Sequence, residues 1–219
     1  MYYLEQMIAA RDTAGSREVV AVCDFDGTIT TADSDVTMNA MAKALGYDSE
    51  FARARDALYR EYRPALDAAA DGERPALERK WWNAQMALFL RHQIPPERYT
   101  DALKSLDFRL RPEAVELLRY CEENDIPVYI VSAGLGNLII PILAWSGCLS
   151  PNLRVLANFV RYDGEKAVSY TAPVTPGNKS AHLQMELSAF DNYLAVIYGN
   201  TEEDLNLLPA EISIPVRAE

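Results

Sequence analysis

The sequence predicts an α/β fold, a doubly wound parallel sheet with an all-helical insertion. Short apolar runs, such as residues 19–23 and 126–131, alternate with helical patterns along most of the chain. Polar residues follow several of these runs, as expected where parallel strands end. Residues 35–107 differ, because they show helical periodicity without strand-like alternation. We therefore expect a core of residues 1–34 and 108–219 and a separate helical segment of residues 35–107.

Composition narrows the classes of function. The chain has 219 residues and a formal net charge of −11, which argues against a nucleic-acid polymer as partner because phosphate backbones require clustered Lys and Arg. No apolar run is long enough to cross a bilayer, and residues 1–17 lack a signal-peptide pattern. The three cysteines lack the spacing of metal ligands and are odd in number. We expect a reduced, cytoplasmic protein without a membrane partner.

The first half of the chain supplies one strand and mostly helices. A helix is expected over residues 2–11, and Gly15-Ser16 separates it from the first strand. The apolar positions then predict four helices, over residues 36–45, 51–66, 77–90 and 97–106. The break between the second and third of these is the Asp71–Pro75 turn.

The second half returns to alternating strands and helices. Pro112 at a first helical position opens a helix to residue 123, and Asn124-Asp125 turns the chain into the second strand. The remaining expected elements are a helix at 138–145, a strand at 153–159, a hairpin at 159–171, a helix at 177–188, a strand at 193–198, a short helix and a strand at 212–216. This alternation is typical of right-handed crossovers in a parallel sheet.

The sequence DFDGT at residues 24–28 directly follows the first strand. Asp is common in turns and helix caps, so one isolated Asp would carry little information. Two carboxylates, a glycine and a threonine at the end of a buried strand instead indicate a ligand site, because ligands bind at the carboxyl ends of such strands. Asp24 and Asp26 are therefore the first candidate functional residues.

Other polar residues recur at strand ends. Ser132 follows the second strand, and Asn200, with Asp204 beyond it, follows a late strand. Lys179 lies at an expected helix start, where backbone N–H groups and the helix dipole favour an anion. A parallel sheet brings strand ends together, so this set predicts a phosphate-handling site.

The order of these motifs resembles the haloacid dehalogenase-like phosphohydrolases, whose four motifs are matched by DFDGT (24–28), VSAG (131–134), GNKS (177–180) and GNTEED (199–204). The run from VSAGLGNLIIPIL (131–143) to SPNLRVLANFVRYDGEKAV (150–168) is similar to the pyrimidine 5′-nucleotidases, the cytosolic 5′-nucleotidase III family. The resemblance covers roughly residues 19–208. It implies a Rossmann-like core, and it implies that the helical segment is a C1-type cap.

The resemblance also implies a mechanism. Asp24 would be the nucleophile that forms an aspartyl-phosphate, and Asp26 the general acid and base. Lys179 would neutralise charge on the phosphoryl group. The phosphoryl oxygens would be held by Thr28 and Ser132, with the backbone N–H groups around Gly27 and Ala133.

The same resemblance implies an Mg²⁺ site. Its ligands would be Asp24, the backbone carbonyl of Asp26 and the side chain of residue 200. The family pattern has Asp where this chain has Asn200, so a neutral amide replaces an anionic ligand, and Asp204, Glu202 or Glu203 could compensate. A second departure is that only residues 209–219 follow the last motif, which predicts a sheet truncated at one edge or an edge covered by a partner chain, such as a second copy in a homodimer.

We expect the cap to set substrate choice. The candidates for contacts to a base or sugar are Asn39, Tyr62, Glu78, Trp81 and Trp82. The first hypothesis is a Mg²⁺-dependent phosphomonoesterase for a nucleoside 5′-monophosphate, of the pyrimidine type. A phosphatase for phosphoserine or a sugar phosphate is the alternative enzyme. A degenerate protein that binds a phosphorylated ligand without turnover is the alternative from another class.

Overall fold

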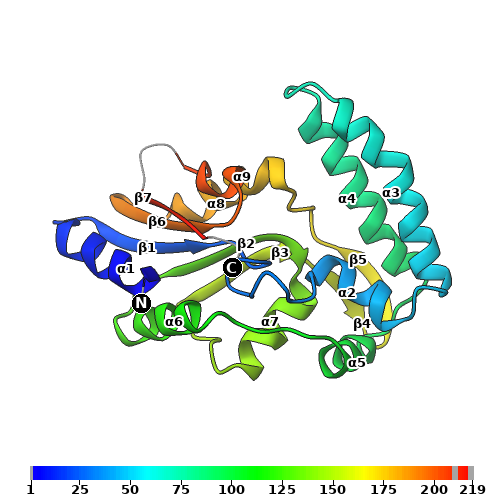
Figure 1. Cartoon of the computed structure of the whole chain (residues 1–219), viewed down its shortest axis with the longest axis horizontal. Helices are drawn as coiled ribbons and strands as arrows, with labels where there is room; N and C mark the ends of the chain where they lie inside the picture. Colours follow the sequence, from blue (N-terminus) through cyan, green and yellow to red (C-terminus); the bar gives the residue numbers. More distant parts are fainter. Residues whose placement is uncertain (1, 209–211, 217–219) are drawn as a thin grey trace.

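The computed structural model describes residues 2–208 and 212–216. Its centre is a parallel sheet in the order β3-β2-β1-β6-β7, as Figure 1 shows. The strands are β1 (Glu18–Cys23), β2 (Val128–Leu135), β3 (Leu153–Asn158), β6 (Tyr193–Gly199) and β7 (Ile212–Pro215). The parallel α/β fold is confirmed. In the strand order, β1 is the central strand and pairs with β2 on one side and β6 on the other.

Helices cover both faces of this sheet. One face carries α1 (Tyr2–Thr13), α6 (Pro112–Glu123) and α7 (Gly136–Trp145), and the other carries α8 (Lys179–Leu187) and α9 (Glu202–Leu205) (Figure 1). Alternate β1 residues serve the two faces: Ala21 and Cys23 belong to the larger buried cluster, and Val20 and Val22 to the smaller one with α8. This explains why the strand is continuously apolar in sequence.

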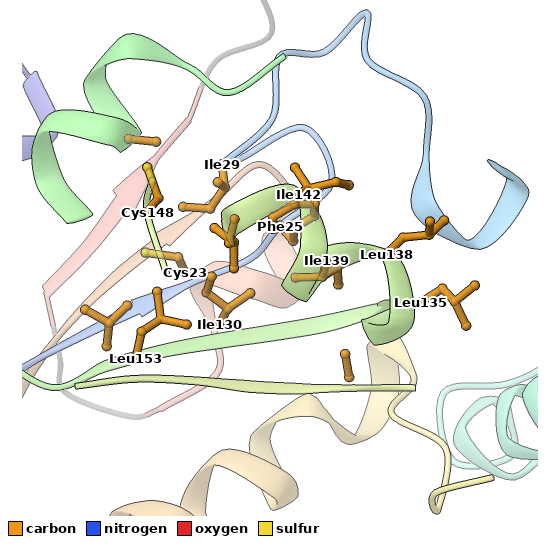
Figure 2. Packing of buried hydrophobic residues seen from close by; sticks show 14 of the residues in the cluster. Cys23, Phe25, Ile29, Ile130, Leu135, Leu138, Ile139, Ile142, Cys148 and Leu153 are labelled. Atoms are coloured by element: carbon orange, nitrogen blue, oxygen red, sulfur yellow. The ribbon is translucent and has the colours of Figure 1, made fainter. Parts of the chain in front are cut away.

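The larger cluster also anchors the loop after β1. Phe25 and Ile29 are fully buried beneath α7, beside Ile139 and Ile142 (Figure 2). Phe25 lies between the two aspartates of DFDGT, so its burial leaves the neighbouring carboxylates facing away from this core. Arg111 supports the same loop, because its guanidinium donates to the carbonyls of Thr30 and Gly27 at 3.2 and 3.3 Å.

The helical segment contains α2 (Thr37–Ala44), α3 (Glu50–Ala68), α4 (Arg74–Arg91) and α5 (Glu97–Ser105). The long helices α3 and α4 form an antiparallel pair that stands beyond the carboxyl ends of the strands (Figure 1). A hairpin of β4 (Val160–Asp163) and β5 (Lys166–Tyr170) lies against this segment, where Tyr162 donates its hydroxyl to the Ile94 carbonyl at 2.8 Å. The division into core and cap remains a prediction.

Several element boundaries differ from expectation, and three of the differences affect the site. Helix α4 begins at Arg74 rather than 77, because Pro75 occupies one of the first helical positions, where proline needs no N–H partner. Strand β2 was expected to end at residue 131 but continues to Leu135. Its pairing with β3 shifts in register between Val131 and Leu135. A short 3₁₀ turn, η1 (Pro176–Asn178), precedes α8 where one helix was expected. Residues 209–211 and 217–219 of the expected C-terminal segment lie outside the described residues.

Candidate active site

Asp24 lies immediately after β1, at the carboxyl end of the sheet. Its backbone N–H continues the strand pairing by donating to the Tyr198 carbonyl at 3.0 Å. The side chain is only 6% exposed, and its Oδ1 accepts from Lys179 Nζ at 2.6 Å. Burial raises the pKa of Asp24, although the Lys179 ammonium opposes that shift. Asp24 is thus a buried carboxylate held by one cation.

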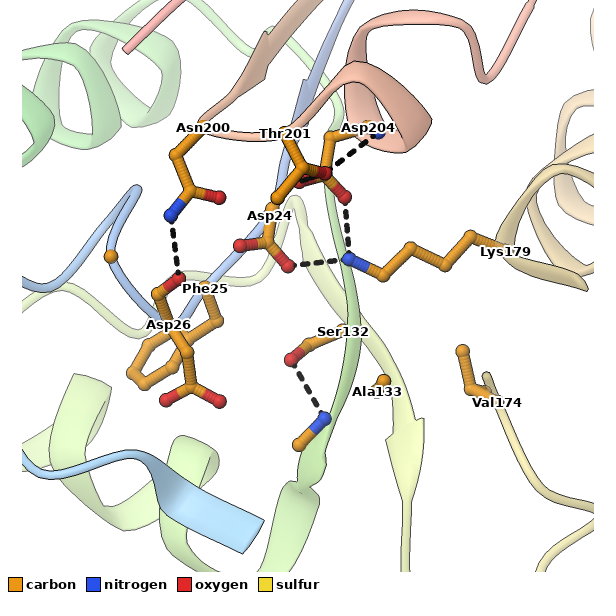
Figure 3. A network of polar contacts seen from close by, with 12 residues as sticks. Asp24, Phe25, Asp26, Ser132, Ala133, Val174, Lys179, Asn200, Thr201 and Asp204 are labelled. Carbon is orange, nitrogen blue, oxygen red and sulfur yellow. Dashed lines mark hydrogen bonds and ion pairs between the residues drawn. The ribbon is translucent and has the colours of Figure 1, made fainter. Parts of the chain in front are cut away.

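Lys179 begins α8 and links two carboxylates. Its Nζ donates to Asp24 and to Asp204 Oδ1, both at 2.6 Å, and its side chain is almost completely buried (Figure 3). Burial acts against the charged form, but the two carboxylates raise the pKa of Lys179 above its ordinary value. The other Asp204 oxygen accepts from Thr201 Oγ1 at 2.6 Å. Asp204 therefore positions Lys179, and its expected role as a metal ligand stays a prediction.

Asp26 has a different environment from Asp24. Its carboxylate accepts from the backbone N–H of Thr37 at 3.0 Å and from the Thr37 hydroxyl at 2.8 Å, at the start of α2. Burial nevertheless raises the pKa of Asp26 to about 6, with the neighbouring Asp24 charge adding to the shift. Near neutral pH this carboxyl can both give and take a proton, as a general acid and base must.

The end of β2 lies beside Asp24 and Asp26 (Figure 3). Ser132 Oγ accepts from the Gly134 N–H at 2.9 Å, and it lies in the space between Asp24 and Asp26 in Figure 3. A Cβ on Gly134 would lie 2.2 Å from Thr37 Oγ1, 2.8 Å from Asp26 Oδ2 and 2.9 Å from Ser132 Oγ. Only glycine lets these three side chains converge.

These residues border a pocket of about 330 Å³, which we call the strand-end pocket. Its lining residues come from the loops after β1 and β6, from η1, α8 and α9, and from α4: Asp24, Asp26, Arg74, Glu78, Pro176, Lys179, Asn200, Thr201, Glu203 and Asp204. Five carboxylates face two cations there, so the pocket has an excess of negative charge. A dianionic ligand would need a further cation beside these residues.

Asn200 lies at the edge of this pocket, beside Gly27. Its Nδ2 donates to the backbone carbonyl of Asp26 at 3.4 Å, and its amide oxygen faces the Asp24 carboxylate (Figure 3). Gly27 has φ +81°, and a Cβ there would come within 2.5 Å of the Asn200 amide. No group of three His, Cys, Asp or Glu side chains within residues 2–208 and 212–216 forms a metal-ligand cluster. The oxygen donors of Asp24, the Asp26 carbonyl and Asn200 nevertheless fit a hard divalent cation, with one carboxylate among them.

Two of the expected phosphate-binding residues do not present their donors to the strand-end pocket. The Gly27 N–H donates to Thr30 Oγ1 at 2.9 Å. Thr28 is fully buried, and its hydroxyl has no hydrogen-bond partner among the described residues. The structure thus brings Asp24, Asp26, Ser132, Lys179 and Asn200 together, and it does not bring the Thr28 hydroxyl into the pocket.

The residues of the helical segment that were expected to contact the substrate make different contacts within the protein. Trp82 Nε1 donates to the Ala133 carbonyl at 3.0 Å, which ties α4 to the end of β2. Glu78 Oε2 accepts from the Gly177 N–H at 2.8 Å. Trp81 packs edge-on against Trp82, with ring centroids 4.8 Å apart. Asn39 Oδ1 accepts from Arg55, and Tyr62 is half-buried on α3 away from the lining of the strand-end pocket.

A family model described as pyrimidine 5′-nucleotidase (UMPH-1) matches residues 31–174, more than half of the chain. The chain belongs to the pyrimidine 5′-nucleotidase (UMPH-1) family. The expected family resemblance is thereby confirmed.

Similar proteins agree with this family. The 7-methylguanosine phosphate-specific 5′-nucleotidase of Drosophila melanogaster is 25% identical over 170 residues, covering 73% of this chain and 52% of that protein. The chain thus spans about half the length of this relative. Cytosolic 5′-nucleotidase IIIB bound to cytidine has a similar structure, with a TM-score of 0.70 at 20% identity over 97% of this chain and 77% of the other.

A substrate-bound phosphoserine phosphatase structure is also similar, with a TM-score of 0.55 at 15% identity over 90% of this chain and 86% of that one. At these identities the structural likeness shows the fold, which is haloacid dehalogenase-like as expected. Phosphatases of this fold generally use a divalent metal. No described helix of this pyrimidine 5′-nucleotidase family member is both long and apolar enough to span a membrane.

Sequence reasoning missed three residues of the site in this family member. Thr37 binds Asp26 from 11 positions along the chain, and a threonine at a helix start gives no sequence signal for that contact. Arg74 reaches the pocket from the helical segment, which no core motif marks. Gly134 belongs to the VSAG motif, but the sequence does not show why a glycine is required there. The reason is the Thr37 hydroxyl, which a Cβ at residue 134 would approach to 2.2 Å.

Proposed function

We propose that this chain is a Mg²⁺-dependent 5′-nucleotidase that hydrolyses a nucleoside 5′-monophosphate through an aspartyl-phosphate on Asp24. The observation that carries the proposal is the separation of roles between two neighbouring carboxyls. Burial raises the pKa of both, but Asp24 forms an ion pair with Lys179 that favours its anion, whereas Asp26 makes no ion pair among the described residues and has a pKa of about 6. Paired carboxyls with different environments are what nucleophilic and acid–base steps require.

In the first step, an Asp24 carboxylate oxygen attacks phosphorus as the bond from phosphorus to the ester oxygen breaks. The protonated Asp26 carboxyl gives its proton to the leaving alcohol. Lys179 keeps Asp24 ionised and oriented. Ser132 Oγ and the Ala133 N–H at the end of β2 would bind the phosphoryl oxygens.

In the second step, the Asp26 carboxylate removes a proton from water, which attacks phosphorus of the aspartyl-phosphate. The bond from phosphorus to the Asp24 oxygen breaks, which releases inorganic phosphate and restores both carboxyls. Asp24, the Asp26 carbonyl and Asn200 would hold the Mg²⁺ ion. When bound, that ion supplies positive charge that offsets repulsion between the carboxylates and the phosphoryl group.

The substrate class rests on family membership and on the helical segment, which we propose acts as the cap. Tyr59, Trp81 and Trp82 form a chain of ring contacts along α3 and α4, with centroids 6.1 and 4.8 Å apart. Trp82 also donates to the Ala133 carbonyl, next to Ser132 at the end of β2. An aromatic surface next to a phosphate site suits a planar base. The Drosophila relative is named for 7-methylguanosine phosphate, which supports a nucleoside monophosphate as the substrate. The family model is named for pyrimidine 5′-nucleotidases, so pyrimidine nucleotides are the first choice.

A panel of phosphomonoesters with released phosphate as the readout tests this proposal. We expect CMP or UMP to give a kcat/KM at least tenfold above those of phosphoserine and glucose 6-phosphate at saturating Mg²⁺. A preference for the last two would favour the alternative phosphatase. Binding of CMP without release of phosphate would favour a protein that only binds the phosphorylated ligand.

A further inference from the structure

Arg74 is the first residue of α4, and it lines the strand-end pocket with Asp24 and Lys179. Its Nε lies 3.3 Å from Glu78 Oε1. Among the described residues, neither of its terminal guanidinium nitrogens makes a hydrogen bond, and its side chain is 49% exposed. Arg74 therefore presents free donors at the pocket from the helical segment.

The other cation of the pocket is already engaged. Lys179 Nζ binds two carboxylates at 2.6 Å each, so little of its charge is left for a ligand. A phosphomonoester carries a charge of about −1.5 to −2 at pH 7. Arginine suits such a group because its planar fork can donate two parallel hydrogen bonds to phosphate oxygens.

Glu78 holds the Arg74 side chain in position. It is 5% exposed, and its two carboxylate oxygens divide their contacts: Oε1 binds Arg74 and Oε2 accepts from the Gly177 N–H at 2.8 Å. A Cβ on Gly177 would lie 2.8 Å from that same Oε2, so the contact depends on glycine. Gly177 is two positions before Lys179. One buried carboxylate thus joins Arg74 to η1, the turn that directly precedes Lys179.

We propose that Arg74 binds the phosphoryl group of the substrate from the helical segment, and that Glu78 is the positioning residue that holds it there. This inference rests on the proposed function, because it assigns a contact within the same site. It adds to the core motifs a phosphate ligand that only this segment can supply. The competing explanation is that Arg74 merely neutralises the buried Glu78 charge.

Binding of inorganic phosphate, measured by isothermal titration calorimetry on the full chain with Mg²⁺ present, tests the proposal without relying on turnover. We expect Arg74→Gln to weaken phosphate affinity about tenfold, as loss of a charge-assisted hydrogen bond at a half-exposed site predicts. Arg74→Lys should recover part of the loss. Arg79→Gln, an exposed arginine on the same helix, is the matched control and should leave phosphate affinity unchanged.

The double variant separates the two explanations. Glu78→Gln keeps an oxygen that can accept from Gly177, so α4 should stay in place while the negative charge is removed. If Arg74 binds phosphate, the double variant Glu78→Gln, Arg74→Gln still binds phosphate more weakly than Glu78→Gln alone, by less than tenfold because Arg74 has lost the carboxylate that positions it. Equal phosphate affinity of those two proteins would overturn the proposal. A wild-type chain that binds phosphate through Arg74 but hydrolyses no monoester would instead contradict the proposed function.

Discussion

Asn200 occupies the position at which the motif resemblance implies an aspartate in the family. It lies beside the Asp26 carbonyl and faces Asp24. Affinity for hard cations rises with the number of charged ligands, so a neutral amide should weaken Mg²⁺ binding.

We therefore expect Asn200→Asp to tighten Mg²⁺ binding by about tenfold or more, as measured by calorimetric titration of the two proteins. Asn192→Asp adds the same charge at an exposed position just before β6, at the opposite end of that strand, and should not change the affinity. Equal Mg²⁺ affinity of the Asn200→Asp and wild-type proteins would show that residue 200 does not ligate the metal.

The Asp26–Thr37 contact gives a prediction for pH dependence. Asp26 must be protonated to act as an acid, and its pKa is about 6, so kcat/KM should fall as pH rises through about 6. Both hydrogen bonds from Thr37 stabilise the carboxylate and lower that pKa. Thr37→Val removes the hydroxyl donor, so the alkaline limb of the pH–rate profile should move to higher pH.

Thr37→Ser keeps a hydroxyl and is the control, for which the limb should stay in place. A limb that moves to lower pH in Thr37→Val, or that is the same in all three proteins, would rule out Asp26 as the group that titrates. Thr37 also receives the Leu135 N–H at 3.1 Å, so the thermal midpoint of each variant should be recorded beside its profile.

At the scale of elements, α4 is the part that joins the helical segment to the sheet. Trp82 binds the end of β2 and Glu78 binds η1, so a single helix touches two of the motif loops. These contacts occupy side chains that sequence analysis assigned to the substrate. Periodicity could identify the helix, but it could not show which loop lies opposite each side chain, since those loops are distant in the chain.

Gly177→Ala tests this junction. Its new Cβ would meet Glu78 Oε2 at 2.8 Å, so we expect the α4–η1 contact to open, at a cost of about 1–2 kcal/mol in the free energy of unfolding. Thermal unfolding should then show a midpoint lower by a few degrees, and amide exchange should increase in η1 and the first turn of α4.

Gly72→Ala is the matched control, because a Cβ there has no heavy atom within 4 Å. An unchanged midpoint in Gly177→Ala, together with unchanged exchange at α4, would mean that Glu78 does not hold the two elements together.

For the molecule as a whole, the sequence was sufficient for the fold class and for most of the site. Strands could be placed because they are buried on both faces and therefore continuously apolar, and their polar ends then marked the pocket. The contacts of Thr37, Arg74 and Gly134 could not be placed, because each depends on how the helical segment docks on the sheet. The Thr28 hydroxyl is fully buried and lies outside the lining of the strand-end pocket, so its expected contact with the phosphoryl group stays a prediction.

The central claim for the whole molecule is that its fold makes Asp24 a nucleophile. Four separate segments of the chain come together around Asp24: the end of β1, the end of β2, the start of α8 and the loop after β6 (Figure 3). The most direct measurement is rapid acid quenching of the enzyme during turnover of its best nucleoside monophosphate, followed by intact mass analysis and peptide mapping. We predict one phosphoryl group on the peptide that contains Asp24, and neither adduct nor turnover in Asp24→Asn. Turnover by the wild-type chain without a trapped adduct, combined with retained turnover in Asp24→Asn, would contradict the account.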